Sequence, residues 1–332
     1  MIGGAVVQRD PFVEFPQYIE KMTRLARMAN LESARHAGHP LLATLVKLNK
    51  ISNAYLTASG LDVSSLGPGP DQVVRQLFDI LTAISMYGYD RISWLADGYF
   101  SELEANSIIR KFIATRLPQA DLYDATMSEL IYWGWLKSKG FFPELADEDG
   151  APDLRVGEDV AGNAVYCEVK SMLPGADSDA IQNVLAKANR QIKKKGGNDA
   201  IGYCLFRVVE PVRHHPVVGN RNGLAILKRS RLDPAVAAIP SQIQRYVDGI
   251  QKHLRSSSYR SVAKVVILWE EQEVVGNIPG WITVCGYRNS VFIDHEQARQ
   301  SVLLQHSGDL LPKATVAANI KLVSRIPLYK YV

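Results

Sequence analysis

The stretch at positions 152–170, PDLRVGEDVAGNAVYCEVK, constrains the fold of this chain more than any other part of the sequence. Its first residues are apolar at alternate positions, turn residues fill 157–163, and 164–169 is short, apolar and partly β-branched. Such a pattern is typical of two short strands joined by a polar turn. We therefore expect a β-hairpin here, with the rest of an α/β fold arranged around it.

Strand geometry predicts which side chains of the second strand lie together. Successive side chains point to opposite faces of a sheet. Tyr166, Glu168 and Lys170 therefore share one face, and Val165, Cys167 and Val169 share the other. The second, apolar set can enter a core. We expect Glu168 and Lys170 to lie side by side at a strand end, with Asp153 approaching from the neighbouring strand.

Two carboxylates and a lysine in this arrangement indicate phosphodiester chemistry. Asp153 and Glu168, on adjacent strands, can hold a hard divalent cation such as Mg²⁺, which prefers oxygen ligands and is completed by water and substrate phosphate. A cation held there polarises a phosphodiester and lowers the pKa of its bound water. Lys170 can orient that water or offset charge that grows on the phosphate in the transition state.

The same residues resemble a known family. Pro152-Asp153, a spacer and Glu168-Val169-Lys170 are similar to the motif of the PD-(D/E)XK nuclease superfamily, which has the restriction-endonuclease-like fold. The resemblance implies that Asp153 and Glu168 bind the metal, that the carbonyl of Val169 also ligates it, and that Lys170 is catalytic. The expected cofactor is Mg²⁺, with Mn²⁺ able to substitute for it.

An acidic residue on the preceding helix has two interpretations. In the family that this chain resembles, an acid on the helix before the hairpin often completes the metal site, and Glu129, on a predicted helix at 122–139, matches that place. Thr126 and Glu129 also have the spacing of a capping box, in which the glutamate only satisfies a backbone N–H group. The sequence leaves both roles open.

Charge is distributed unevenly around the motif. Positions 121–160 carry ten acidic residues against three basic ones, whereas positions 187–231 carry eleven basic residues against two acidic ones. A helix predicted to be capped by Asp177 or Ser178 and to end at Lys195 presents a basic stripe. Such a stripe is suited to phosphate contacts that position a nucleic acid without reading its bases. The candidate nucleic-acid-binding residues on this helix are Lys187, Arg190, Gln191 and Lys194. A merely solvated basic surface is the alternative.

Composition excludes several other classes of protein. The sequence has no uncharged apolar run of about 18 residues, so we expect no membrane span. Its first residues, MIGGAVVQRDPF, lack the features of a secretion signal, and we expect a cytoplasmic protein. Cys167, Cys204 and Cys285 are sparse and widely spaced, which argues against disulfides and structural zinc and favours buried thiols.

The chain of 332 residues is long enough for two moderate domains. Residues 1–120 read as a mostly helical domain for substrate contact, dimerisation or partner docking, and 121–332 as the nuclease-like domain. Helices are expected at 16–30, 41–56, 71–88, 93–116 and 240–254, and strands at 200–209, 261–269, 281–293 and 320–332. We expect an α/β fold with a restriction-endonuclease-like mixed sheet flanked by helices, preceded by this amino-terminal mostly helical domain.

The resulting expectation is a metal-dependent nuclease. The resemblance favours an endonuclease that acts on double-stranded DNA, with a role in restriction or anti-phage defence by analogy. The chain lacks the P-loop pattern of an accompanying helicase. A non-catalytic nucleic-acid-binding or assembly protein on the same fold is one alternative, and an RNA-directed nuclease is another. A homodimer or a protein partner bound through the helical domain is also compatible with the sequence.

Overall fold

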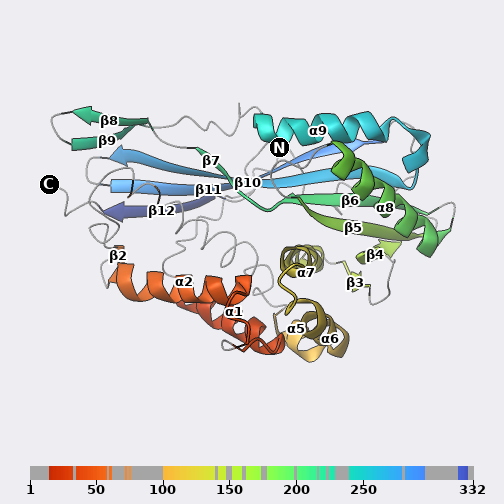
Figure 1. The fold of residues 1–332 in the computed structure, drawn as a ribbon, viewed down its shortest axis with the longest axis horizontal. Helices are drawn as coiled ribbons and strands as arrows, with labels where there is room; N and C mark the ends of the chain where they lie inside the picture. The colour runs from red at the N-terminus through yellow and green to blue at the C-terminus, as the bar shows by residue number, and fades with distance from the viewer. Residues whose placement is uncertain are drawn as a thin grey trace.

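The computed structural model places a mixed β-sheet at the centre of the protein, with helices on both of its faces (Figure 1). The structure describes residues 15–32, 35–57, 60–61, 72, 75, 100–138, 141–146, 152–158, 162–172, 178–197, 200–214, 217–221, 224–228, 239–278, 281–295 and 321–327. Within these residues the fold is α/β, as the sequence predicts. The membership of this fold in the restriction-endonuclease-like class stays a prediction.

The central sheet has eight strands in the described part of the chain. Its order is β12 (Lys321–Pro327), β11 (Trp281–Asp294), β10 (Val262–Ile278), β6 (Ile201–Val208), β5 (Ala164–Met172), β4 (Leu154–Glu158) and β3 (Glu144–Leu145), with β7 (Val212–His214) also paired to β10. The pairs of β6 with β5 and with β10 are parallel, and β3, β4, β11 and β12 pair antiparallel with their neighbours. Two short hairpins, β1 (Leu56–Thr57) with β2 (Gly60–Leu61) and β8 (Val217–Arg221) with β9 (Leu224–Lys228), complete the strands.

The hairpin predicted at 152–170 is confirmed. β4 and β5 pair antiparallel, with Leu154 opposite Cys167 and Glu158 opposite Ala164. The sequence analysis expected one buried face on β5, but both faces are covered, and every residue from Val165 to Val169 is buried. The structural reason is that β5 is an inner strand, between β4 and β6, with helices on both sides of the sheet.

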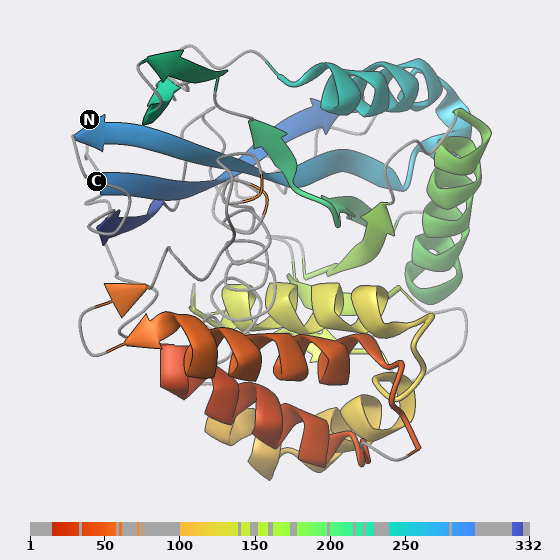
Figure 2. The same ribbon diagram turned by 60° about the vertical axis from the view of Figure 1, so that its left-hand side comes forward.

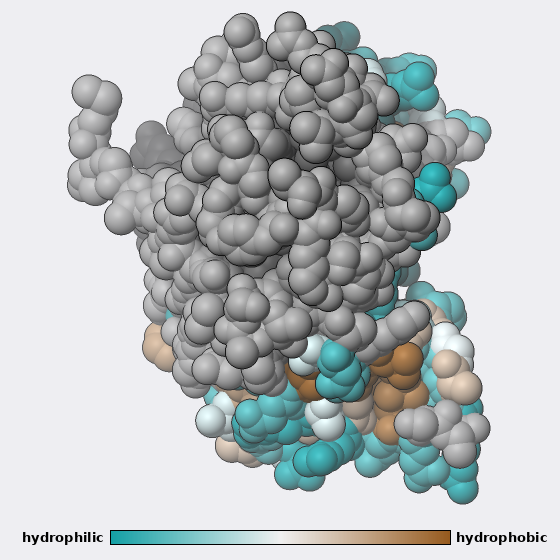
Figure 3. All heavy atoms as spheres, turned by 90° about the vertical axis from the view of Figure 1, so that its left-hand side faces the viewer, coloured by the Kyte–Doolittle hydropathy of each residue, from teal (hydrophilic) through white to brown (hydrophobic). Residues whose placement is uncertain are grey.

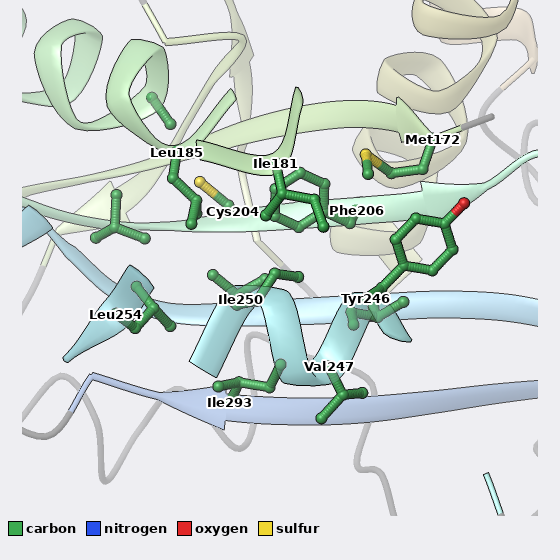
Figure 4. Packing of buried hydrophobic residues seen from close by; sticks show 14 of the residues in the cluster. Met172, Ile181, Leu185, Cys204, Phe206, Tyr246, Val247, Ile250, Leu254 and Ile293 are labelled. Carbon is green, nitrogen blue, oxygen red and sulfur yellow. The ribbon is translucent and has the colours of Figure 1, made fainter. Parts of the chain in front are cut away.

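Two helices cover one face of the sheet as parallel crossovers. α8 (Ser178–Gly196) connects β5 to β6, and α9 (Ser241–Leu254), followed by the 3-10 helix η3 (Ser257–Tyr259), leads into β10. Apolar side chains of both helices interdigitate with those of the strands below them, as Figure 4 shows. The labelled residues of this core are Met172, Ile181, Leu185, Cys204, Phe206, Tyr246, Val247, Ile250, Leu254 and Ile293.

The remaining helices lie on the opposite face. α7 (Tyr123–Ser138) packs directly on β5, and α1 (Phe15–Met28), α2 (Pro40–Tyr55), α5 (Phe100–Ala105) and α6 (Ser107–Arg116) form a layer beyond it (Figures 1 and 2). Mostly hydrophilic side chains, with a few hydrophobic ones among them, cover these amino-terminal helices at the lower end of the molecule in Figure 3. None of the helices in the described ranges is long and apolar enough to cross a membrane.

Some expected elements differ from the structure. The single helix expected at 93–116 is wrong for its described part, because α5 ends at Ala105 and Asn106 caps a new helix, accepting hydrogen bonds from the N–H groups of Ile108 and Ile109. β10 continues nine residues beyond Trp269, where the sequence analysis ended it. The helix predicted at 71–88 falls almost entirely outside the described residues.

Candidate functional site

The β4–β5 hairpin brings Asp153 and Glu168 together. Asp153 immediately precedes β4 and stands opposite Glu168, one step before the pair of Leu154 with Cys167. The Asp153 backbone N–H donates to Glu168 Oε2 at 3.2 Å, and the Val169 backbone N–H donates to Asp153 Oδ2 at 2.7 Å. The Asp153 carboxylate thus accepts a hydrogen bond from the backbone of β5, just before β4 begins.

Lys170 lies next to both carboxylates. Its Nζ forms an ion pair with Glu168 Oε1 and lies 3.5 Å from Asp153 Oδ2. The three side chains are largely withdrawn from solvent, with exposed fractions of 0% for Glu168, 13% for Asp153 and 20% for Lys170. An ammonium group therefore joins two carboxylates that are 15 residues apart in the sequence, in a place where water screens charge poorly.

Burial and neighbouring charges shift the pKa values of both Glu168 and Lys170. Burial, together with the charge of Asp153, raises the pKa of Glu168 to about 7, although Lys170 opposes this shift. Burial lowers the pKa of Lys170, but the charges of Asp153 and Glu168 outweigh it, and the net direction is upward. Lys170 is therefore an ammonium ion at neutral pH, and it cannot act as a general base in this arrangement.

Glu129 also lies near this group, but its carboxylate is engaged. Both oxygens accept hydrogen bonds from Arg116, at 2.6 Å and 2.7 Å, and the residue is 1% exposed. Burial and the charge of Asp153 raise the pKa of Glu129 to about 8, against the opposing charge of Arg116. Glu129 thus lies within electrostatic reach of Asp153. Its ion-pair partner is Arg116, which the sequence did not lead us to expect.

The capping-box interpretation of Glu129 is wrong. Thr126 lies inside α7, where its backbone N–H donates to the carbonyl of Leu122 at 2.9 Å. The Thr126 hydroxyl has no hydrogen-bond partner among the described residues, and Glu129 bonds to Arg116 instead of a backbone amide. α7 starts at Tyr123, four residues earlier than a cap at Thr126 would require.

The donor set fits a hard divalent cation with few protein ligands. In the described part of the chain, no three His, Cys, Asp or Glu side chains converge on a common metal position. Mg²⁺ typically keeps several waters and uses only one or two carboxylates together with substrate phosphate. Asp153 and Glu168 meet that requirement. The ammonium group of Lys170 forms ion pairs with both carboxylates.

Two polar groups beside the site were missed by the sequence analysis. Arg207 donates to Ser128 Oγ at 3.0 Å, and Ser128 Oγ lies 3.1 Å from Ser171 Oγ, so α7 is tied to β5 and β6 next to Lys170. Tyr132 and Tyr203 share a buried hydrogen bond of 2.6 Å between their hydroxyls. Ser128 and Tyr132 are four residues apart on α7, and this spacing is the sequence signal that both face the sheet.

Arg116 is the most informative of the missed residues, because a signal for it exists. Glu129 stands among apolar residues on α7, and a buried carboxylate needs a cation or a set of hydrogen-bond donors. Arg116 ends the helix immediately before α7, and it is the nearest basic residue that precedes Glu129 in the sequence.

The basic helix is placed as expected, except for one side chain. Lys187, Arg190 and Lys194 are exposed on α8. Gln191 is buried, with 9% of its surface exposed, and it lies among the core-facing residues of the helix. The exposed cations present a basic surface, and Gln191 presents little surface to a ligand in this arrangement.

The cysteines with described side chains agree with the expectation of buried thiols. Cys167 and Cys204 are free and fully buried, and burial raises the pKa of each thiol well above its ordinary value. The side chain of Cys285 lies outside the described residues.

Comparison with known proteins assigns neither a family nor a function to this chain. No protein-family model, no curated protein and no solved structure matches the chain.

Proposed function

We propose that the protein is a divalent-metal-dependent nuclease that hydrolyses phosphodiester bonds in double-stranded DNA, with a PD-(D/E)XK-like site. The observation that carries the proposal is the convergence of Asp153, Glu168 and Lys170 through the β4–β5 hairpin, with Lys170 in contact with both carboxylates. An endonuclease of the restriction-endonuclease-like class is the finer form of the proposal, and it rests on the resemblance of the motif.

In this proposal Asp153 and Glu168 would hold the cation, and the carbonyl of Val169 would be a further ligand. A bound Mg²⁺ or Mn²⁺ supplies Lewis-acid polarisation of the phosphate and an acidified water. Asp153 is held in place by the Val169 N–H group, so its carboxylate is oriented before any ligand arrives. Such preorganisation lowers the cost of reaching the transition state.

Lys170 supplies positive charge where negative charge grows during hydrolysis. Because the flanking carboxylates keep it protonated, its ammonium can donate hydrogen bonds to a phosphate oxygen or to the attacking water, rather than accept a proton. The exposed cations of α8, Lys187, Arg190 and Lys194, contact backbone phosphates in this proposal and position the duplex without reading its sequence.

Cleavage by the purified protein tests the proposal. Supercoiled plasmid, single-stranded DNA and RNA are incubated with Mg²⁺, with Mn²⁺ or with a chelator, and the products are separated on gels. Wild type should nick or cut the plasmid only when metal is present. The variants Asp153→Asn, Glu168→Gln and Lys170→Met should each lower the rate on the order of 100-fold or more.

A matched lysine separates loss of the site from general damage. Lys264 on β10 is 15% exposed and pairs with Asp294 at 3.2 Å, so Lys264→Met also removes a largely buried, ion-paired lysine from the same sheet. This variant should cut at close to the wild-type rate. Binding of nucleic acid without metal-dependent cutting would support a non-catalytic binding protein, and preferential cutting of RNA would support the RNA-directed alternative.

A further inference from the structure

Arg116 reaches the candidate site from the amino-terminal helices. It is the last residue of α6, and its guanidinium lies over the ring of Phe112, 4.7 Å from the ring centroid. From there it donates to both oxygens of Glu129, at 2.7 Å and 2.6 Å. A two-pronged contact of this kind fixes the plane of a carboxylate as well as its position, which a lysine cannot do.

The contact is needed because of where Glu129 lies. Its side chain is 2% exposed, and the negative charge of Asp153 acts on it unfavourably. A buried carboxylate beside another one is expensive without a cation of its own. Arg116, with 28% of its side chain exposed, provides that cation from the solvent side. Arg116 thus favours the charged form of Glu129, within electrostatic reach of Asp153, although burial and Asp153 still raise the pKa of Glu129 to about 8.

The position of Arg116 depends in turn on the other amino-terminal helices. The carbonyl of Leu117, the next residue, accepts a hydrogen bond of 2.7 Å from His39 Nε2 at the start of α2. The Nδ1 atom of the same ring accepts from the Leu41 N–H group at 3.2 Å, which places the imidazole proton on Nε2. The carboxyl end of α6 is therefore anchored to α2, just where Arg116 leaves the helix.

We propose that Arg116 is a positioning residue, which fixes the Glu129 carboxylate within electrostatic reach of Asp153 so that Glu129 supports cation binding at Asp153 and Glu168. This inference rests on the proposed function. Glu129 has both oxygens bonded to Arg116, so it acts as an outer carboxylate, which accepts hydrogen bonds from water of the bound cation. Outer partners of this kind orient the ligands of a metal site and tune its affinity. The amino-terminal helices thus form part of the site.

Direct titration with Mn²⁺ alone tests the proposal without any nuclease substrate. Mn²⁺ affinity is measured by calorimetry, or by the electron paramagnetic resonance signal of free Mn²⁺, for wild type, Asp153→Asn, Arg116→Gln, Arg116→Lys and Glu129→Gln. Arg116→Gln and Glu129→Gln should each weaken binding about tenfold, as is typical for outer partners. Arg116→Lys should retain part of the affinity, since it keeps the charge but loses the two-pronged geometry.

The double variant Arg116→Gln/Glu129→Gln shows whether Arg116 acts through Glu129. If it does, the double variant binds Mn²⁺ no more weakly than Glu129→Gln alone, because the two effects are not additive. Arg110→Gln is the matched control, since Arg110 is exposed on the same helix, and its Mn²⁺ affinity should equal that of wild type. Thermal unfolding of every variant identifies those that fail to fold.

The outcomes distinguish failure of the role given to Arg116 from failure of the proposed metal site. Wild-type affinity in Arg116→Gln, or additive losses in the double variant, overturns the role of Arg116 while the proposed metal site stands. Equal Mn²⁺ binding by wild type and Asp153→Asn, or no binding at all, overturns the proposed site itself. If Arg116→Gln does not fold, Arg116→Met/Glu129→Leu replaces the pair by apolar side chains. Wild-type Mn²⁺ affinity in that folded double variant would overturn the inference.

Discussion

The ionisation of Glu168 is set by its surroundings, and it makes the stability of the metal-free protein depend on pH. Burial and the charge of Asp153 raise its pKa from about 4.5 to about 7, so the folded state favours the protonated form. A carboxyl group whose pKa rises on folding stabilises the folded state most below its unfolded pKa, and this contribution is lost as pH rises through the folded pKa. The free energy of unfolding should therefore fall between about pH 4.5 and about pH 7.

Urea denaturation in the presence of a chelator, at steps from pH 5 to pH 8, measures this effect. Glu168→Gln keeps the shape of the side chain but removes its titration, so its unfolding free energy should decline less with pH than that of wild type. Glu129 titrates in the same direction, and part of the decline should therefore remain in Glu168→Gln. Equal slopes in the two proteins would show that Glu168 does not carry a raised pKa.

At the residue scale, the hairpin residues were predictable; the sequence indicates Arg116 as a partner for Glu129, but not the geometry of their contact. Asp153, Glu168 and Lys170 come together through one local turn and the strict alternation of a strand, both of which are readable from the sequence. The contact of Arg116 with Glu129 depends on how α6 packs beside α7, which local patterns do not encode. The burial of Glu168 likewise depends on helices covering both faces of the sheet.

At the scale of elements, Gly202 determines how closely α8 approaches the sheet. A Cβ atom at this position on β6 would lie 2.5 Å from the backbone oxygen of Tyr166 and 2.8 Å from Cδ1 of Ile192 on α8. Because the nearest neighbour is backbone of β5, Gly202→Ala must displace β6 from β5, and Ile192 on α8 must move as well. The substitution should destabilise the protein by about 1–3 kcal/mol, the usual range for overpacking.

Gly157 on β4 provides the control, because no atom lies within 4 Å of the Cβ that alanine would add there. Chemical denaturation of both alanine variants measures the difference. Gly157→Ala should unfold at nearly the wild-type denaturant concentration, and Gly202→Ala at a clearly lower one. Similar midpoints for all three proteins would mean that α8 packs less closely on the sheet than the structure describes.

Three helices, α7, α8 and α9, were predicted more accurately than the strand β10, for a physical reason. The observed bounds of α7, α8 and α9 lie within about two residues of the expected ones, because helical periodicity and capping are local signals. β10 was predicted only as far as its apolar run. Its continuation pairs with β11 from Glu270 to Ile278, and such a pairing depends on a distant strand rather than on local sequence.

At the scale of the whole molecule, the charge on α8 should govern binding of nucleic acid. Replacing the exposed residues Lys187, Arg190 and Lys194 by alanine should weaken DNA binding. It should also make the slope of log K against log salt concentration shallower, by roughly 0.9 for each phosphate contact removed. Fluorescence anisotropy of labelled duplex DNA at several salt concentrations measures both quantities.

The control for this prediction removes the same charge from a different surface. Lys47 on α2 and Arg110 and Lys111 on α6 are exposed on the helices of the opposite face, and their triple alanine variant should bind DNA nearly as wild type does. Equal loss of affinity in both triple variants would indicate that only net charge matters and that α8 is not the contact surface.

The central claim is that Asp153 and Glu168 together hold a divalent cation beside Lys170. Anomalous X-ray diffraction from crystals grown with Mn²⁺ tests it most directly, because the anomalous signal locates the metal independently of any substrate. The account predicts a peak within coordination distance of carboxylate oxygens of both Asp153 and Glu168, and no such peak in Asp153→Asn. A peak elsewhere in the molecule, or none at saturating Mn²⁺, would contradict it.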